Sequence, residues 1–182
     1  MSKTYVSADD FLADSWRLAK AIRVGGWRPD WIVGLWRGGA FACVSVHEYL
    51  KVSGWDVRHL PLKCSSYSGI DARTGTVELT FAAETFAKFA PGERILAVDD
   101  VFDTGRTAEA LAERLRPLGV DFRIATVYWK PERNETSMKP DYFVRDVGSK
   151  WVVFPHEIEG LTKDEIREKS PVLADLLSEQ FL

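Results

Sequence analysis

The run ILAVDDVFDTGRT, residues 95–107, constrains the fold more than any other part of this sequence. It starts with an apolar stretch of strand length, continues through the acids Asp99, Asp100 and Asp103, and ends in a small, hydroxyl-rich turn. Apolar residues then recur at helical spacing, at Ala108, Leu111, Leu115 and Leu118. This order predicts a buried strand, a turn and an amphipathic helix, the unit from which parallel sheets are built.

The same alternation recurs along the chain. Strands are predicted at 31–35, 56–64, 94–98, 122–129 and 141–147, and Pro61 indicates an edge position for the second. Helices are predicted from Ser7 to Gly25, over 38–50, from Thr104 to about Pro117, and in two short C-terminal segments. We therefore predict a single α/β domain over 1–182, with a mainly parallel central sheet flanked by helices. Such sheets bind ligands at the carboxyl ends of their strands.

Composition excludes several classes of protein. A chain of 182 residues that is 46% hydrophobic and 28% charged is typical of one globular domain. No apolar run reaches the length of a membrane span, and the first residues lack the apolar core of a signal peptide. A net charge of -3 argues against nucleic-acid binding, and two distant cysteines indicate no disulfide framework. A cytoplasmic location is expected.

The acids and the turn suit the two ends of one small ligand. Adjacent carboxylates at a strand end need a compensating partner, either a metal ion or sugar hydroxyls. Residues 104–107 offer backbone N–H groups, hydroxyls and a helix N-terminus, which suit a phosphate. Walker and dinucleotide-binding glycine motifs are absent. A ribose 5′-phosphate fits this order of groups better than acids capping an ordinary surface turn.

Residues 95–107 resemble the phosphoribosyl-pyrophosphate (PRPP) signature of type I phosphoribosyltransferases, and the likeness is closest to the 6-oxopurine branch. The resemblance implies that Asp99 and Asp100 hold the ribose hydroxyls and Mg²⁺, Asp100 being the direct ligand. It implies that Asp103 lies near purine N7 as the catalytic acid or base. The 5′-phosphate would be bound by Thr104, Gly105, Arg106 and Thr107.

Other segments match the same family. Arg37 and Gly38 resemble its pyrophosphate loop, which often has a cis peptide before the arginine, although Trp36 replaces a small residue. Residues 65–80 correspond to a flexible catalytic loop, in which Arg73 would bind pyrophosphate. Residues 148–182 would form a C-terminal hood and extension.

The purine base would be bound by Lys130, Trp151 and Val152 together with Asp103. By resemblance, Lys130 donates to the exocyclic O6, and an ammonium, which cannot accept, favours 6-oxo over 6-amino purines. Trp151 would stack on the base and the backbone of Val152 would read its edge. His156 stands where the family commonly has Trp. Five other tryptophans are expected to pack in the interior, namely Trp16, Trp27, Trp31, Trp55 and Trp129.

The sequence thus predicts a purine-salvage enzyme that binds PRPP, a 6-oxopurine and Mg²⁺, and the family implies a homo-oligomer, a dimer or a tetramer. Three alternatives stay open: a phosphoribosyltransferase for another base, a PRPP- or nucleotide-sensing regulator, and an unrelated nucleotide-binding α/β protein. His47–Glu48 lacks a metal-binding spacing, and the sequence has no nucleophile elbow.

Overall fold

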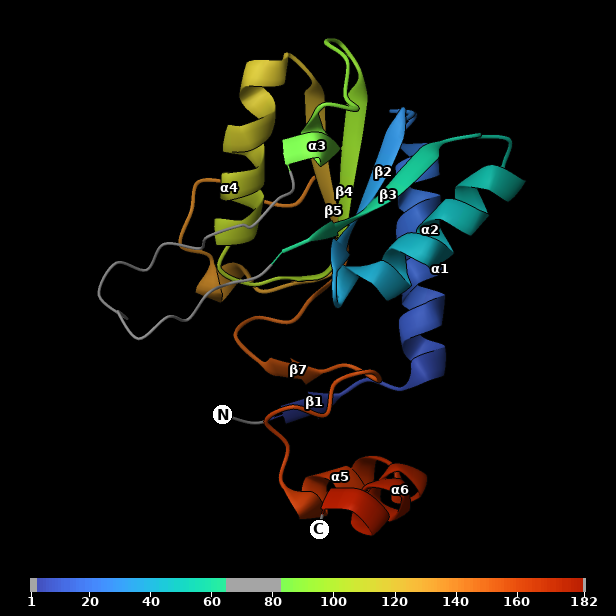
Figure 1. The fold of residues 1–182 in the computed structure, drawn as a ribbon, viewed down its shortest axis with the longest axis vertical. Coiled ribbons are helices and arrows are strands. Elements are labelled where there is room, and N and C mark those ends of the chain that lie inside the picture. The colour runs from blue at the N-terminus through green and yellow to red at the C-terminus, as the bar shows by residue number, and fades with distance from the viewer. Residues whose placement is uncertain (1–2, 65–82, 182) are drawn as a thin grey trace.

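A computed structural model describes residues 3–64 and 83–181 and contains a parallel five-stranded sheet (Figure 1). The strand order is β3-β2-β4-β5-β6, and every neighbouring pair is parallel. The strands are β2 (Trp31–Trp36), β3 (Arg58–Lys63), β4 (Arg94–Phe102), β5 (Asp121–Trp129) and β6 (Tyr142–Asp146). The predicted fold class is confirmed, and β3 is an edge strand, as Pro61 indicated.

Helices cover both faces of this sheet (Figure 1). On one face, α1 (Ala8–Val24) and α2 (Gly39–Val52) enclose a core that includes Leu18, Ile32, Leu96 and Phe154. On the other face lies α4 (Arg106–Leu115), followed by the short 3₁₀ helix η1 (Arg116–Leu118), with α3 (Ala83–Phe86) nearby. The apolar side of α4 is the one predicted, since Ala108, Leu111 and Leu115 are buried.

The predicted helix α1 is present, but the helical spacing of Leu12, Trp16, Ala19 and Ile22 identifies its buried face only in part. Ala19 and Ile22 are buried as the spacing predicts. The spacing of Leu12 and Trp16 placed both in the interior, yet they are 39% and 47% exposed. The buried positions include Phe11 and Asp14 instead, so the prediction that Trp16 packs in the interior is wrong. Asp14 is fully buried because Arg145, Arg17 and Tyr128 all donate hydrogen bonds to its carboxylate. The spacing of apolar residues does not identify this face of α1, because the burial of Asp14 depends on hydrogen bonds from the sheet residues Tyr128 and Arg145.

β4 is longer than predicted, which moves the acids. The expected strand ended at residue 98, whereas β4 continues to Phe102 and carries Asp99 and Asp100 within it. Pairing with β2 stops at Val98, while pairing with β5 continues to Phe102. The acids therefore lie where β4 keeps a neighbour on one side only, at the carboxyl end of the sheet.

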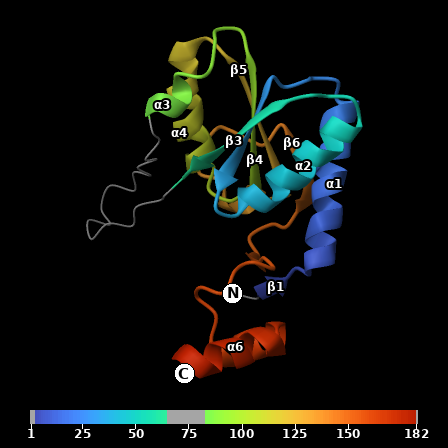
Figure 2. The ribbon, with the colours of Figure 1, turned by 45° about the vertical axis from the view of Figure 1, so that its right-hand side comes forward.

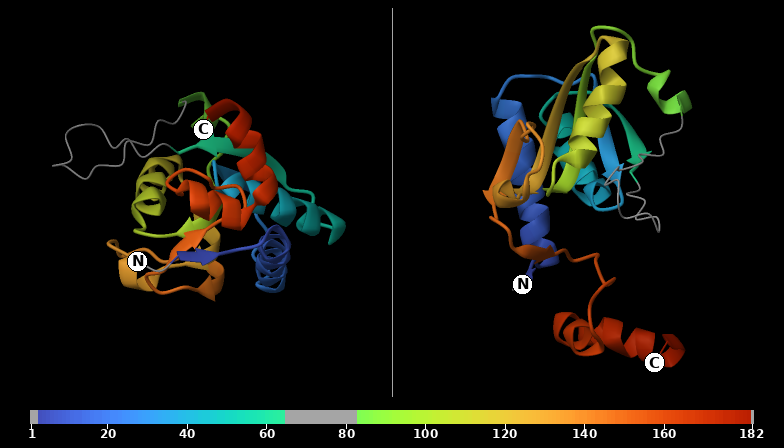
Figure 3. Two further views of the ribbon diagram at one scale, coloured as in Figure 1. Left: turned by 90° about the horizontal axis from the view of Figure 1, so that it is seen from below. Right: turned by 90° about the vertical axis from the view of Figure 1, so that its left-hand side faces the viewer.

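A smaller layer lies beyond this end of the sheet (Figures 2 and 3). Here β1 (Lys3–Tyr5) pairs in parallel with β7 (Trp151–Val153), a strand pair that the sequence reading did not anticipate. Two helices follow, α5 (Lys163–Lys169) and α6 (Pro171–Phe181), and a capping box at Thr162 and Glu165 starts the first as predicted. No helix of the described residues has the length and apolarity needed to cross a bilayer.

Candidate functional site

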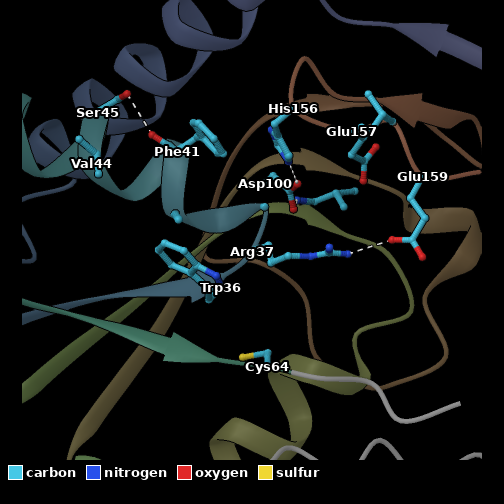
Figure 4. Close-up of a pocket in the computed structure, with 14 residues that line it drawn as sticks. Trp36, Arg37, Phe41, Val44, Ser45, Cys64, Asp100, His156, Glu157 and Glu159 are labelled. Atoms are coloured by element: carbon cyan, nitrogen blue, oxygen red, sulfur yellow. Dashed lines mark hydrogen bonds and ion pairs between the residues drawn. The ribbon is translucent and has the colours of Figure 1, made fainter. Parts of the chain in front are cut away.

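A hollow of about 990 Å³ opens at the carboxyl end of the sheet (Figure 4). It lies between the loop after β2, the first turns of α2, the end of β4 and the segment after β7. Three of the predicted site residues line it: Arg37, Gly38 and Asp100. Its remaining walls include Trp36, Phe41, Val44, Cys64, His156, Glu157, Ile158 and Glu159.

The loop after β2 has the expected form. The Trp36–Arg37 peptide bond is cis, and Trp36 is half-exposed at the mouth of the hollow. The backbone of Gly38 lies against Asp100 so closely that a Cβ there would be 1.9 Å from Oδ2 of that carboxylate. Glycine is therefore required for this approach. The Arg37 guanidinium extends to Glu159 at 3.3 Å, and both side chains are exposed, as Figure 4 shows.

The acids of β4 carry a cost that a ligand would offset. Burial raises the pKa of Asp100 to about 6, and burial together with the neighbouring Asp100 charge raises the pKa of Asp99 well above its ordinary value. The amide of Val101 donates to Oδ1 of Asp100 at 2.8 Å. With Glu157 also nearby, this carboxylate is suited to a hard divalent cation such as Mg²⁺, which prefers oxygen ligands.

The turn between β4 and α4, which the sequence analysis assigned to the 5′-phosphate, is held in a fixed shape. Gly105 has a φ of 82°, and a side chain there would collide with Thr136 and Asn134, which pack against the turn. The amide of Glu135 donates to the carbonyl of Thr104 at 2.9 Å, which holds this second segment in place. Arg106, the first residue of α4, pairs with Glu135 at 2.6 Å. The turn thus presents the first amides of a helix whose start is fixed from both sides.

Asp103 lies between two cations. Lys130 Nζ donates to Oδ2 at 2.9 Å, and Arg133 Nε donates to Oδ1 at 2.5 Å. The Lys130 side chain is only 10% exposed, which fits a donor placed beside a bound base. Sequence reasoning missed Arg133. Its signal was its spacing from Lys130, because η2 (Pro131–Arg133) is a 3₁₀ helix, in which residues three apart lie on one side.

The segment after β7 forms the far wall of the hollow. The imidazole of His156 stacks on Phe41, with ring centroids 4.7 Å apart and planes 11° apart, and its Nε2 lies 3.7 Å from Oδ2 of Asp100. Burial lowers the pKa of His156, so the imidazole is neutral at pH 7. From α5, Lys169 Nζ donates to the carbonyls of Phe154, at 2.6 Å, and Glu157. One ammonium thus binds the backbone on both sides of His156.

The predicted base-binding residues stand apart from this hollow. Trp151 is 41% exposed, and the ammonium of Lys3 lies 5.1 Å from its ring centroid. Val152 is buried. Among the described residues, the structure gathers Arg37, Gly38 and Asp100 in the hollow and Asp103 with Lys130 in a second group, while Trp151 and Val152 lie on β7. Arg73 and the predicted loop 65–80 lie outside the described residues.

A parallel sheet with acids at its carboxyl end, a helix that starts beside them and a glycine loop that faces them is an arrangement in which open α/β proteins bind phosphate-bearing ligands. The chain matches the family described as phosphoribosyl transferase domain over residues 2–160. It belongs to this family, in the type I, 6-oxopurine branch, as the sequence predicted.

Individual relatives agree with this placement. A xanthine-guanine phosphoribosyltransferase from Cereibacter sphaeroides is 30% identical over 85% of this chain and 86% of its own length. A hypoxanthine-guanine phosphoribosyltransferase from Lactococcus lactis is 38% identical, but the match spans about half of each chain, 49% and 47%. A crystal structure of a purine phosphoribosyltransferase from Pyrococcus horikoshii has a TM-score of 0.68 at 28% identity, and covers 89% of this chain and 99% of that one.

Proposed function

We propose that this protein transfers the 5-phosphoribosyl group of PRPP to a 6-oxopurine (hypoxanthine, guanine or xanthine), which yields a nucleoside 5′-monophosphate and pyrophosphate. This is a pentosyltransferase reaction of purine salvage. The observation that carries the proposal is the Asp103–Lys130 pair, 2.9 Å apart, beside the β4–α4 turn. A carboxylate and an ammonium at this place offer an acceptor for the N7 proton and a donor for O6.

The chain's own residues would position the substrates. The amides and hydroxyls of residues 104–107 would bind the 5′-phosphate, while Asp99 and Asp100 would bind the ribose hydroxyls. This grip on both ends of the sugar holds C1′ in line with the base, which is mainly an orientation effect. Arg37 and the Gly38 backbone face the hollow on the side where pyrophosphate would leave. The same role is assigned to Arg73.

Asp103 would act during the transfer itself. Breaking the C1′–O bond develops positive charge on the sugar, as in glycoside hydrolysis, and a nearby carboxylate stabilises that charge. The same carboxylate would accept the N7 proton. For this, Lys130 has to turn from Asp103 toward O6 of the incoming base, and Arg133 would then remain as the partner of Asp103. Trp151 would stack on the base and the Val152 backbone would contact its edge.

The proposal includes Mg²⁺ as cofactor, held by Asp100 with Asp99, where it would neutralise charge on the departing pyrophosphate. It also includes a homo-oligomeric state, a cytoplasmic location, a C-terminal hood formed by residues 148–182 and a single domain over 1–182. The location follows from chemistry, because PRPP and nucleoside monophosphates are charged metabolites that are retained inside cells.

Turnover tests the proposal directly. The purified protein with PRPP and Mg²⁺ should release pyrophosphate with hypoxanthine, guanine or xanthine, and not with adenine, orotate or uracil. Lys130→Met should reduce kcat/KM for the base by about 10²-fold with little change in the KM for PRPP, because a buried donor to a specific acceptor is lost. PRPP binding without turnover of any base would instead indicate a regulator, and turnover of adenine would overturn the specificity.

A further inference from the structure

The inner wall of the hollow brings together three different metal-ligand side chains. One oxygen of Asp100, one nitrogen of His156 and one oxygen of Glu157 all lie within 4.8 Å of one another. They come from two elements, since Asp100 lies on β4 and the other two follow β7. The sequence analysis assigned Mg²⁺ binding to Asp100 with Asp99, and it noted His156 only as a departure from the family pattern.

The spacing of these atoms suits an ion better than a direct hydrogen bond. His156 Nε2 and Asp100 Oδ2 are 3.7 Å apart, which is too long for an N–H···O bond. Two ligands at about 2.1 Å from one metal ion lie at most about 4.2 Å apart, so this gap accommodates an ion between them. The third donor, on Glu157, lies within 4.8 Å of the other two, so a movement of its side chain would bring it onto the same ion.

The imidazole is held in place before any ion binds. His156 stacks on Phe41 at 4.7 Å and lies parallel to Phe154 at 5.7 Å, with planes 11° and 15° apart. Lys169 fixes the backbone carbonyls of Phe154 and Glu157 around it. The aromatic rings occupy the faces of the imidazole, and its Nε2 edge is directed at Asp100 (Figure 4). Such preorganisation is typical of a ligand position rather than of a mobile surface histidine.

The carboxylates are held in the same way. The Val101 amide engages Oδ1 of Asp100 at 2.8 Å, and the Phe154 amide engages Oε2 of Glu157 at 3.2 Å. Each carboxylate keeps a second oxygen for a ligand. Asp99 adds a third carboxyl group next to Asp100, so a cation at this point offsets the cost of bringing three acids together.

We propose that Asp100, His156 and Glu157 form a binding site for a divalent transition-metal ion such as Mn²⁺ or Co²⁺. Mg²⁺ favours oxygen ligands, whereas an imidazole nitrogen raises affinity for Mn²⁺, Co²⁺ and Zn²⁺. His156 therefore gives this chain a preference that a site built only from carboxylates lacks. Any part that the ion plays in pyrophosphate departure rests on the proposed function, but the existence of the site does not.

Metal binding is measured on the full chain without PRPP or base, so that its outcome is independent of turnover. The chain has three histidines, and the other two, His47 and His59, lie against each other with ring centroids 4.4 Å apart. A His47→Ala/His59→Ala background removes this competing pair. In that background, the electron paramagnetic resonance signal of free Mn²⁺ should fall on titration with protein, with a stoichiometry of one. Co²⁺ should develop visible absorption bands.

His156→Phe is the decisive variant, because phenylalanine preserves the stack on Phe41 and removes the nitrogen. We expect this variant to lose at least tenfold in Mn²⁺ affinity and to lose the imidazole hyperfine coupling in pulsed electron paramagnetic resonance spectra. Its Mg²⁺ affinity should stay within twofold of that of the background protein. Unchanged Mn²⁺ affinity in His156→Phe, or no Mn²⁺ binding by the background protein, overturns the proposal. If His156→Phe does not fold, Glu157→Gln serves, with a similar expected loss. Turnover with Mg²⁺ in the His47→Ala/His59→Ala background separately tests the proposed function.

Discussion

The two sides of the candidate site are built by different means. The phosphate side consists of β4 and the fixed turn that joins it to α4. β4 has hydrogen-bonded neighbours on both sides up to Val98, and its residues 95–98 are completely buried. The hood side consists of the three-residue β1–β7 pair and residues 154–159, tied down largely by side chains such as Lys169 and by the Lys3–Glu165 pair. Backbone ladders position groups rigidly, whereas side-chain contacts adjust. We infer that the phosphate side fixes the sugar and that the hood side adapts to base and cation.

The largest effect is expected on the phosphate side, at Asp103. Asp103→Asn keeps the shape of the side chain and its contact with Lys130 through the amide oxygen, but it cannot accept the N7 proton. We expect kcat to fall by about 10²–10⁴-fold, with the KM for PRPP within about threefold of the wild-type value. Steady-state kinetics with each substrate varied in turn provides the measurement. An equal loss in PRPP affinity would show that Asp103 only binds.

Asp100→Asn should separate activity from stability. Because burial raises the pKa of Asp100 to about 6, the folded protein holds this proton to a higher pH than the unfolded chain does. The free energy of unfolding therefore decreases as the pH rises from about 4 through about 6, and the neutral amide avoids that loss. We expect the variant to be about 1–3 kcal/mol more stable than wild type at pH 8, and to lose about tenfold or more in kcat/KM for PRPP.

Denaturant titrations with EDTA present, at pH 8 and at pH 5, measure this difference. The stabilisation should shrink at pH 5, where the wild-type carboxyl is protonated in the folded state. Equal stabilisation at both values would mean that the Asn side chain packs better, independently of charge, and a less stable variant at pH 8 would contradict the assignment of a costly buried carboxylate.

The phosphate side was more predictable from the sequence than the hood side. Residues 95–107 predicted a strand, acids, a turn and a helix, because all these signals are local in the chain. The turn and the helix are where they were predicted. The end of this strand was predicted too early, at residue 98, because acidic residues normally indicate that a buried strand has ended. The hood was not predictable in the same way. The β1–β7 pair joins residues about 150 positions apart, and the Lys169 contacts depend on where α5 docks.

Arg133 and His156 illustrate the same limit. Arg133 is three residues from Lys130, but that spacing alone does not identify Asp103 as its partner. A lone His in a loop carries no local pattern that identifies Asp100 as its neighbour. Asp14 is the converse case, because its partners Tyr128 and Arg145 allow an acid of α1 to be fully buried, where a sequence pattern predicts exposure. Hydrophobic periodicity carries no information about polar partners that are distant in the sequence.

On the hood side, Lys169→Met should have a moderate effect confined to the base. It removes the ammonium that binds the carbonyls of Phe154 and Glu157. The Phe154 carbonyl keeps the Glu157 amide as a donor at 3.1 Å, whereas the Glu157 carbonyl loses the Lys169 hydrogen bond. We expect the KM for the purine to rise about fivefold, the KM for PRPP to stay within twofold, and stability to fall by about 1–3 kcal/mol. Lys163→Met, an exposed position on the same helix, is the matched control and should change neither value. A rise in the KM for PRPP of equal size would show that the two sides are not separable.

The smallest effect is expected at Glu159, where the two sides touch. Its pair with Arg37 is 3.3 Å long, and the two side chains are 86% and 80% exposed, so the pair adds little to stability. Pyrophosphate would nevertheless have to displace the Glu159 carboxylate from the Arg37 guanidinium before binding it. Glu159→Gln should therefore lower the Kd for pyrophosphate by about twofold, and the gain should disappear at about 0.5 M salt, where the charge interaction is screened. Isothermal titration calorimetry at two salt concentrations measures this. A Glu159→Gln variant that binds pyrophosphate more weakly would place Glu159 among the groups that hold the ligand, and the loop after β2 would then depend on the hood for its function.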